Sequence, residues 1–319
     1  MPHCPFPLVK GLAAAIVALL TGTASAPAVE SGILTLSHDG QERSALVDMA
    51  RDTENAPVLI ALHGGLAGPY TVRRKARVSL AREGWVVVWP FAINDWNDGR
   101  TDWRGRPHDD ADDIGFLRRL VDRLVAAGVA DRDRVFVAGP SIGGIMALRL
   151  MCDAPDMVAG VAVAIAAFAE DYECRDGPAK PVLFIHGTDD GLVPPDGGRI
   201  GGWSPLVAER GNVMPVDRTM EIIARRNGCA GFEAYDLPDR APNDGSTVEL
   251  REYRDCTQPL VHFVVEGGGH TWPGASPSGL GARIVGATNQ DFSATEAVQD
   301  FFRALAGEGG AALPPLRPR

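Results

Sequence analysis

The sequence predicts an α/β domain in which a mostly parallel sheet is flanked by helices on both faces. Short, almost continuous apolar runs recur along the chain, as in strands that are covered on both sides. Segments with helical periodicity separate these runs, which favours right-handed crossover connections. The chain has 319 residues, of which 45% are hydrophobic and 23% charged, so it suits one large globular domain and neither a disordered nor a fibrous protein.

The elements follow one another in a regular order. Alternating apolar and polar residues around His38-Asp39-Gly40 predict an edge hairpin over residues 31–50. The strands expected after it are 57–62, 85–90, 134–138, 158–165, 181–185, 248–253 and 260–265. The expected helices are 70–82, 110–127, 142–151, 216–226 and 294–305. Residues 191–213 are rich in Gly and Pro, and we expect them to form an irregular loop near the carboxyl ends of the strands, where the sites of such sheets lie.

Both ends of the chain differ from this domain. Lys10 precedes an apolar run over residues 11–20, and small residues follow as far as Ala28, which is typical of an export signal. Cleavage after Ala26 would make Pro27 the first residue of the mature chain, which is unfavourable for cleavage. Cleavage after Ala28 is therefore the alternative. A membrane anchor is disfavoured because the run is shorter than the roughly 20 residues of a span.

We therefore predict three parts and an exported protein. The parts are a signal peptide over residues 1–28, an α/β catalytic domain over 29–306 and a flexible Gly- and Pro-rich tail over 307–319. The mature protein is expected to be secreted, either extracellular or periplasmic, and to leave the membrane once the signal is removed. The sequence does not predict an oligomeric state.

The net charge of the chain limits the classes of molecule that it is expected to bind. The formal net charge of −10 argues against binding to nucleic acid or anionic membranes, which requires clustered Lys and Arg, and it favours neutral substrates. No metal or cofactor is predicted. The acidic loop 95–99 has its glycine one position too early for a calcium loop and no glutamate at the required place. Four aspartates at the start of a predicted helix are interpreted as caps that also interact favourably with the helix dipole; they are Asp109, Asp110, Asp112 and Asp113.

Four cysteines remain after Cys4 is removed with the signal. An even number in an exported chain favours disulfides over buried thiols. Of the three possible pairings, Cys152 with Cys174 and Cys229 with Cys256 is favoured, because each pair closes a local excursion between core elements. No pair has the close spacing of a zinc knuckle.

The sharpest chemical signal is the segment Gly139-Pro140-Ser141-Ile142-Gly143, which lies between a predicted strand and a predicted helix. The pattern G-x-S-x-G in this context is typical of the nucleophile turn of α/β-hydrolases. The helix that follows offers backbone N–H groups to a developing oxyanion. Ser141 is therefore the candidate nucleophile.

A serine nucleophile needs a base, and the base needs a group that orients it. In α/β-hydrolases these residues follow in the order serine, acid, histidine. His270 is the candidate base because it follows the last core strand in a Gly-rich loop, whereas His262 lies inside that strand and is expected to be a partly buried histidine with satisfied hydrogen bonds. Asp190, after the strand 181–185, is the candidate acid, with its neighbour Asp189 as the alternative.

Two further groups of residues are expected to contact the substrate. The backbone N–H groups of Gly65 and Ile142 are the candidate oxyanion donors, with Gly64 and Leu66 as alternatives to Gly65. Four tryptophans lie in predicted loops and could line a pocket. Trp272 is the candidate for substrate binding because it follows the candidate base by two residues; the others are Trp96, Trp103 and Trp203.

Several motifs together resemble the secreted polyhydroxybutyrate-depolymerase-like esterases, which are related to feruloyl esterases. These motifs are Leu62-His63-Gly64, the loop 96–100, the segment 112–117, the serine box with Gly144, the acid loop 186–193 and the segment 267–274. The resemblance implies ester hydrolysis through an acyl-enzyme with Ser141, Asp190 and His270. In the serine box, Pro140 and Ile142 depart from the pattern typical of the family.

The expected function is that of a secreted serine esterase acting on hydroxyalkanoate oligomers or small esters. No polymer-binding module or Thr- or Ser-rich linker is recognised, which disfavours solid polyester as the substrate. The alternative enzyme is a feruloyl or acetyl-xylan type carbohydrate esterase. The alternative from another class is a binding protein of the same fold without catalytic activity.

Overall fold

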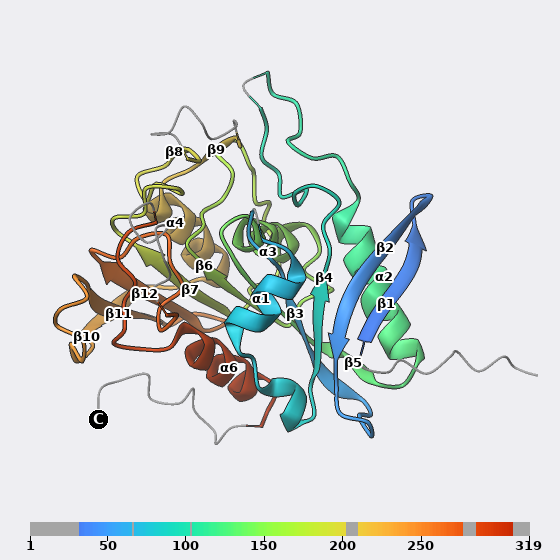
Figure 1. The fold of residues 1–319 in the computed structure, drawn as a ribbon. Coiled ribbons are helices and arrows are strands. Elements are labelled where there is room, and N and C mark those ends of the chain that lie inside the picture. Colours follow the sequence, from blue (N-terminus) through green and yellow to red (C-terminus); the bar gives the residue numbers. More distant parts are fainter. Residues whose placement is uncertain (1–31, 66, 103, 202–209, 277–284, 309–319) are drawn as a thin grey trace, which may run out of the picture.

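One large sheet forms the centre of the molecule (Figure 1). The computed structural model describes residues 32–308, except 66, 103, 202–209 and 277–284. Ten strands pair in the order β1-β2-β4-β3-β5-β6-β7-β12-β11-β10. They are β1 (Gly32–His38), β2 (Gln41–Asp48), β3 (Ala56–Ala61), β4 (Val86–Pro90), β5 (Ala130–Pro140), β6 (Gly160–Ala164), β7 (Val182–Gly187), β10 (Gly231–Asp236), β11 (Thr247–Arg254) and β12 (Leu260–Glu266).

The middle of the sheet is parallel and its two edges are antiparallel. Strands β4, β3, β5, β6, β7 and β12 run in one direction, so their carboxyl ends share one edge. The hairpin of β1 and β2 joins β4 antiparallel at one side, and β11 and β10 extend the other. This arrangement confirms the predicted fold class. Strand β10 was not predicted, because its residues are exposed or half-buried and do not form a continuous apolar run.

Helices cover both faces of the sheet. They are α1 (Pro69–Ala76), the 3₁₀ turn η1 (Leu80–Glu83), α2 (Asp113–Ala126), α3 (Ile142–Asp153), α4 (Val216–Asn227) and α6 (Ala294–Leu305). Buried side chains of α2, α3 and α4 belong to one apolar cluster, and those of α6 and η1 belong to a second cluster on the other face. The helix expected over 70–82 is divided, because Arg77 takes a left-handed conformation that ends α1.

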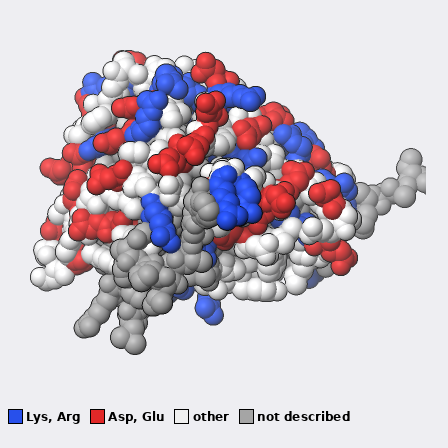
Figure 2. Space-filling view, turned by 90° about the horizontal axis from the view of Figure 1, so that it is seen from above, with Lys and Arg blue, Asp and Glu red and all other residues white. Residues whose placement is uncertain are grey.

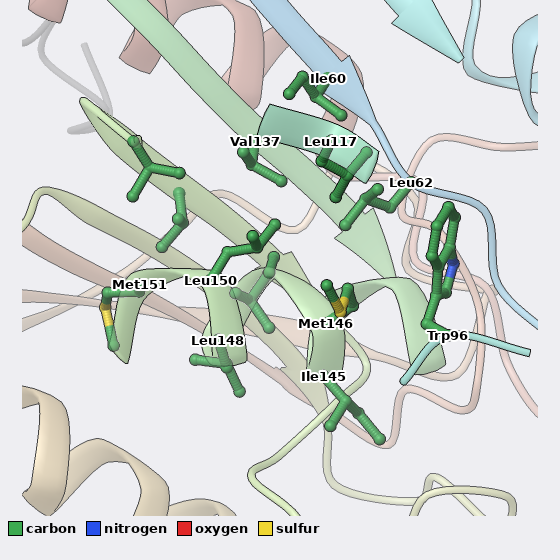
Figure 3. Packing of buried hydrophobic residues seen from close by; sticks show 14 of the residues in the cluster. Ile60, Leu62, Trp96, Leu117, Val137, Ile145, Met146, Leu148, Leu150 and Met151 are labelled. Carbon is green, nitrogen blue, oxygen red and sulfur yellow. The ribbon is translucent and has the colours of Figure 1, made fainter. Parts of the chain in front are cut away.

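Helix α3 is buried on nearly all sides, which explains its almost continuous apolar sequence. Its side chains Ile145, Met146 and Leu150 lie in the same cluster as Ile60 of β3 and Val137 of β5 (Figure 3). Interiors packed in this way tolerate little displacement. The turn between β5 and α3 is therefore supported by the rigid centre of the molecule.

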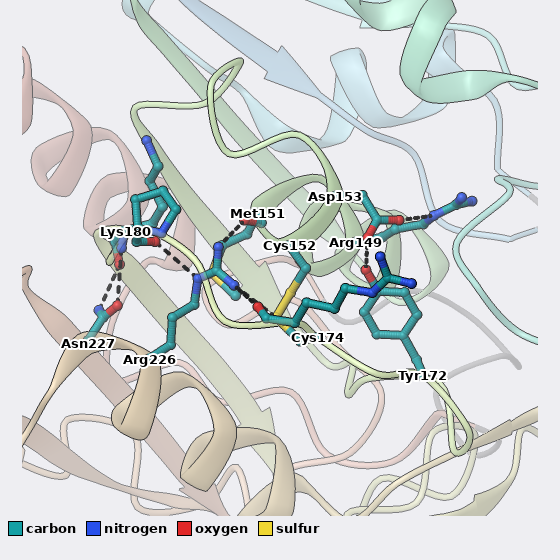
Figure 4. The surroundings of a disulfide bond; sticks show 11 residues. Arg149, Met151, Cys152, Asp153, Tyr172, Cys174, Lys180, Arg226 and Asn227 are labelled. Carbon is teal, nitrogen blue, oxygen red and sulfur yellow. Dashed lines mark hydrogen bonds and ion pairs between the residues drawn. A yellow bond between two sulfur atoms is a disulfide. The ribbon is translucent and has the colours of Figure 1, made fainter.

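Two disulfides join the cysteine pairs that the sequence favours. Cys152 at the end of α3 bonds to Cys174, and their Cα atoms are 5.3 Å apart. Cys229 bonds to Cys256, and their Cα atoms are 4.1 Å apart. Near the first bond, the guanidinium of Arg226 donates to three backbone carbonyls and contacts Cys174 Sγ (Figure 4). Arg226 thus ties helix α4 to the excursion that this disulfide closes.

The segment 191–213 is irregular, as expected, apart from a short pair formed by β8 (Gly198–Arg199) and β9 (Asn212–Val213). Residues 202–209 within it lie outside the described residues. The predicted signal peptide (1–28) and most of the predicted tail (307–319) also lie outside them. Within the part of the chain that the structure describes, none of the helices combines the length and apolar character that a membrane span requires.

Candidate active site

Ser141 occupies the sharp turn between β5 and α3. Its backbone has φ 55° and ψ −130°, a region that residues with a side chain rarely adopt and that costs free energy. The turn is held by the Ser141 N–H, which donates to Ala164 O at 2.9 Å, and by Ser141 O, which accepts from Ile145 N at 3.0 Å. The strain is thus maintained by β6 on one side and the first turn of α3 on the other.

Two glycines allow this turn to pack. A Cβ placed on Gly139 would lie 2.5 Å from the backbone of Gly143, and one on Gly143 would lie 2.6 Å from His63 O. Neither distance is compatible with a side chain. The spacing of glycines in the serine motif therefore has a steric cause, since β5, α3 and the end of β3 approach one another at these positions.

Asp190 and His270 are brought together although 80 positions separate them in the sequence. His270 Nδ1 lies 2.7 Å from Asp190 Oδ2, and the other carboxylate oxygen accepts from the backbone N–H groups of Leu192 at 2.9 Å and Val193 at 2.8 Å. Both side chains are largely buried, with 13% of His270 and 3% of Asp190 exposed. The carboxylate is therefore fixed from one side and orients the imidazole from the other.

The two loops that carry these residues are bonded to each other. Thr188 Oγ1 accepts from Gly267 N at 2.8 Å, and Asp189 N donates to Gly268 O at 2.9 Å. The backbone of His270 donates in turn to Val285 O. Since β7 and β12 are neighbours and end at the same edge of the sheet, these bonds place Asp190 and His270 side by side.

His262 is not available as the base, because it is fully buried within β12. Its Nε2 lies 2.8 Å from Nδ1 of His186, which is also buried. Burial lowers the pKa of both imidazoles, that of His186 to about 4. Among the described residues, Nδ1 of His262 has no hydrogen-bond partner. The structural role expected for His262 agrees with this position, but the side chain is more buried than expected and one of its ring nitrogens lacks the expected partner.

The segment after β3 lies beside the serine turn. A Cβ on Gly64 would lie 3.5 Å from Ser141 Cβ, and one on Gly65 would lie 3.7 Å from Cδ1 of Ile142. Ile142 is the first residue of α3, so its N–H has no acceptor within the helix. The structure thus brings the two candidate oxyanion residues to the same turn. Leu66, the other alternative, lies outside the described residues.

His63 positions this segment, a role that the sequence motif did not reveal. The Ala92 N–H donates to His63 Nε2 at 3.3 Å, which leaves the ring proton on Nδ1, and Nδ1 donates to Gly64 O at 2.9 Å. Burial lowers the pKa of His63, which favours this neutral form. In a trans peptide the N–H points opposite to the C=O, so His63 directs the N–H of Gly65 away from its own ring.

The tryptophans considered as pocket residues differ in position. Trp96 is a core residue and does not line an open pocket: it is fully buried, and its indole N–H donates to His63 O at 2.9 Å. Trp272 is half-buried, packs against the cluster on the α6 face and donates to Thr295 Oγ1 at 3.0 Å. Trp103 and Trp203 lie outside the described residues.

The acidic residues at the start of α2 have structural partners. Asp112 caps the helix by accepting from Gly115 N, as expected. Asp113 is buried and accepts from Arg43 at 2.6 Å and from Asn97 N at 2.7 Å. Over the described ranges of the chain, no group of three or more His, Cys, Asp or Glu side chains is arranged to hold a metal ion.

Two known proteins similar to this chain are named esterases. The chain is 32% identical over 261 residues to "Putative esterase NocK" of Nocardia uniformis subsp. tsuyamanensis, covering 78% of this chain and 74% of that protein. It is 26% identical over 167 residues to Feruloyl esterase B of Piromyces equi, covering 50% of this chain and 29% of that protein. No family model matches the chain.

The fold has a counterpart among solved structures. Acetyl xylan esterase from Aspergillus awamori superposes with a TM-score of 0.54 at 14% identity, over 75% of this chain and 94% of that chain. At this identity the likeness shows the fold alone. The α/β-hydrolase fold and the family resemblance predicted from the sequence are both confirmed. The chain therefore belongs to the family of α/β-hydrolase esterases and is a carboxylic ester hydrolase.

Proposed function

We propose that this esterase hydrolyses its substrate through an acyl-enzyme on Ser141, with His270 as general base and Asp190 as the group that orients it. One observation carries the proposal: the bond of 2.7 Å between His270 Nδ1 and Asp190, at the edge of the sheet where Ser141 is held at positive φ. Serine at its ordinary pKa is a weak nucleophile, and an imidazole oriented in this way is the group that activates it.

The proposed reaction has two similar halves. His270 Nε2 takes the proton of Ser141 Oγ as the oxygen attacks the ester carbonyl, and it then gives that proton to the leaving alcohol. Water attacks the acyl-enzyme in the second half, again with His270 as base, and releases the acid. Asp190 stays ionised throughout and stabilises the imidazolium that forms in each half.

The proposed oxyanion donors are the backbone N–H groups of Gly65 and Ile142. Their neighbouring positions and the free N-terminus of α3 support this assignment. A donor of this kind contributes about 2.7–4 kcal/mol to transition-state stabilisation. Trp272 is the proposed substrate contact, because its half-buried ring follows the base by two residues.

For the substrate, we propose hydroxyalkanoate oligomers or small esters, as the resemblance to polyhydroxybutyrate-depolymerase-like esterases implies. A feruloyl or acetyl-xylan type carbohydrate ester is the second candidate, favoured by the relative named feruloyl esterase and the structural neighbour named acetyl xylan esterase. Export to an oxidising compartment is proposed as well, supported by the two disulfides and the signal-like first residues.

A fluorophosphonate probe tests the mechanism directly. We expect one adduct, located on Ser141 by mass spectrometry, and we expect Ser141→Ala to lose both labelling and ester hydrolysis. Ser37→Ala, an exposed serine on β1, is the matched control and should behave as the unchanged protein. Labelling elsewhere, or hydrolysis that survives Ser141→Ala, contradicts the mechanism. If the unchanged protein is not labelled and hydrolyses none of the esters, the binding-protein alternative is favoured.

Substrate class requires a panel. Linear hydroxybutyrate oligomers, p-nitrophenyl acyl esters, methyl ferulate and acetylated xylan are compared by kcat/KM with the same enzyme preparation. The highest value is expected for the oligomers. A higher value for methyl ferulate or acetylated xylan would favour the carbohydrate esterase instead.

A further inference from the structure

An arginine lies against the proposed oxyanion segment. A Cβ placed on Gly65 would lie 2.8 Å from Nη1 of Arg210 and 3.7 Å from Cδ1 of Ile142. The guanidinium of Arg210 therefore contacts the segment that carries one proposed donor, next to the residue that carries the other. Its side chain is 20% exposed, so a bound molecule can reach it. The mechanism proposed above makes no use of this charge.

Arg210 belongs to a compact ionic cluster. Asp95 Oδ2 lies 3.0 Å from Arg210 Nη1, 3.2 Å from His108 Nε2 and 3.9 Å from Arg100 Nη2. Asp98 is bound to Arg100 Nε at 2.8 Å. The single oxygen Asp95 Oδ2 thus faces nitrogen atoms of three side chains, so the cluster has more N–H donors than acceptor oxygens.

Two observations show that shortage. Arg100 is fully buried, and its Nη2 has no hydrogen-bond partner among the described residues. Within the same residues, Asp95 is the one carboxylate at ion-pair distance from Arg210. A guanidinium presents five N–H donors, and the bond to Asp95 uses a single nitrogen of Arg210. As far as the described residues go, donors of Arg210 therefore remain for an anionic group that enters the site.

The overall charge of the molecule does not favour an anion. Figure 2 shows the molecule from above, the side towards which β4 runs in Figure 1, and acidic and basic side chains are interspersed over its visible part. The whole chain carries a formal net charge of −10. The charges of Arg100 and Asp98 offset each other, so attraction for an anion at this site is local and arises from the N–H groups of Arg210 that the bond to Asp95 does not use.

We propose that Arg210 binds a free carboxylate of the substrate close to the ester that is cleaved, so the preferred substrates are esters of hydroxy acids with an ionised carboxyl end. This inference rests on the proposed function and deepens it. In a linear hydroxy-acid oligomer the last ester bond lies a few atoms from the terminal carboxylate. Arginine recognises carboxylates with two parallel hydrogen bonds, whereas the alcohol of a sugar ester presents no such charge.

A matched pair of substrates isolates this contact. The linear dimer of 3-hydroxybutyrate carries a carboxylate, and its methyl ester at that carboxyl is neutral but keeps the same internal ester bond. The unchanged enzyme is expected to prefer the dimer. In Arg210→Met we expect kcat/KM for the dimer to fall by about 10- to 100-fold, because a charged hydrogen bond is lost, and cleavage of that internal bond in the methyl ester to change by less than about threefold.

The controls separate recognition from structure. Arg118→Met removes another arginine that is ion-paired with an aspartate, Asp156, and should leave both substrates unaffected. Monomeric 3-hydroxybutyrate should inhibit the unchanged enzyme competitively, and this inhibition should weaken by about tenfold in Arg210→Met. Thermal unfolding of each variant shows whether the fold is retained.

Two results overturn the proposal. An equal loss for the dimer and its methyl ester in Arg210→Met would show that Arg210 only positions the Gly65 segment. Unchanged kinetics on both substrates would show that it does not contact the substrate. Either result leaves fluorophosphonate labelling of Ser141 intact, whereas absence of labelling and of all ester hydrolysis in the unchanged enzyme would mean that the proposed function itself fails.

Discussion

Asp189 and Asp190 are neighbours in sequence but have different surroundings. The carboxylate of Asp190 bonds to His270 and to two backbone N–H groups, whereas that of Asp189 lies 3.4 Å from the hydroxyl of Thr188. The choice between them depends on the direction in which each side chain leaves the loop. The turn propensity of aspartate does not predict this direction, because aspartate suits a turn equally well at both positions.

Replacement of each aspartate by asparagine tests this difference. Asp190→Asn is expected to lower kcat by about 10⁴-fold, since an amide favours the wrong imidazole tautomer and does not stabilise the imidazolium. Asp189→Asn should change kcat by less than about threefold. Steady-state hydrolysis of a p-nitrophenyl ester measures both. The reverse ranking would assign the role to Asp189.

His63 is expected to act as a positioning residue. His63→Ala removes the bond to Gly64 O, so the Gly65 peptide loses its orientation, and kcat should fall by about 10- to 100-fold with a smaller change in KM. His63→Asn keeps a donor near the position of Nδ1 and should restore part of kcat. A loss confined to KM, or equal losses in both variants, would contradict the positioning role.

At the scale of elements, the site depends on how loops are attached to strands. The loops after β7 and β12 are bonded to each other, and the segment after β3 is held by the turn between β5 and α3. These attachments all lie at the carboxyl ends of parallel strands. Helix α4 is anchored separately: its Arg226 contacts Cys174 of one disulfide, and Cys229 of the other disulfide follows just after the helix ends.

The disulfide between Cys229 and Cys256 is expected to contribute to stability rather than to catalysis. Its cysteines are 27 positions apart, and a loop of that size gives about 3.5 kcal/mol through restriction of the unfolded chain. Cys229→Ala with Cys256→Ala should lower the free energy of unfolding by that amount and leave kcat/KM nearly unchanged. Denaturant unfolding followed by tryptophan fluorescence measures the first quantity. An unchanged free energy of unfolding would contradict the expectation.

At the scale of the whole molecule, buried histidines make stability depend on pH. Burial lowers the pKa of His63, His186 and His262 in the folded state, that of His186 to about 4. In the unfolded chain they titrate near 6.5. Between these values the unfolded state binds more protons, so the free energy of unfolding falls as the pH is lowered below 6.5.

This dependence can be measured between pH 7 and 5, where most carboxylates remain ionised. Each histidine that stays neutral in the folded state adds a slope approaching about 1.4 kcal/mol per pH unit below pH 6. The free energy of unfolding is obtained from denaturant unfolding curves at each pH. Replacing both buried histidines, by His186→Leu and His262→Phe, should reduce the slope of this free energy against pH. A slope that is the same in the variant and the unchanged protein would contradict the assignment of the effect to these residues.

The predictable part of the molecule is the part with local causes. Apolar runs and helical periodicity depend on residues close in sequence, so the central strands and the closing helix over 294–305 were predicted near their observed bounds. Strand β10 was missed because an exposed edge strand needs no apolar pattern, only a neighbour to pair with. The serine motif was recognisable because its glycines are required by close contacts within the turn itself. Gly139, for example, packs directly against the backbone of Gly143.

By itself, then, the sequence determined the α/β class, the serine turn and the order of the candidate triad, and it favoured the cysteine pairing that the structure shows. The tertiary structure alone decided which aspartate meets His270, that Trp96 supports His63 from the core, and that Arg210 lies against Gly65. The physical reason is distance along the chain. These contacts join loops from different strands, and their geometry follows from how the sheet brings the carboxyl ends of its strands together.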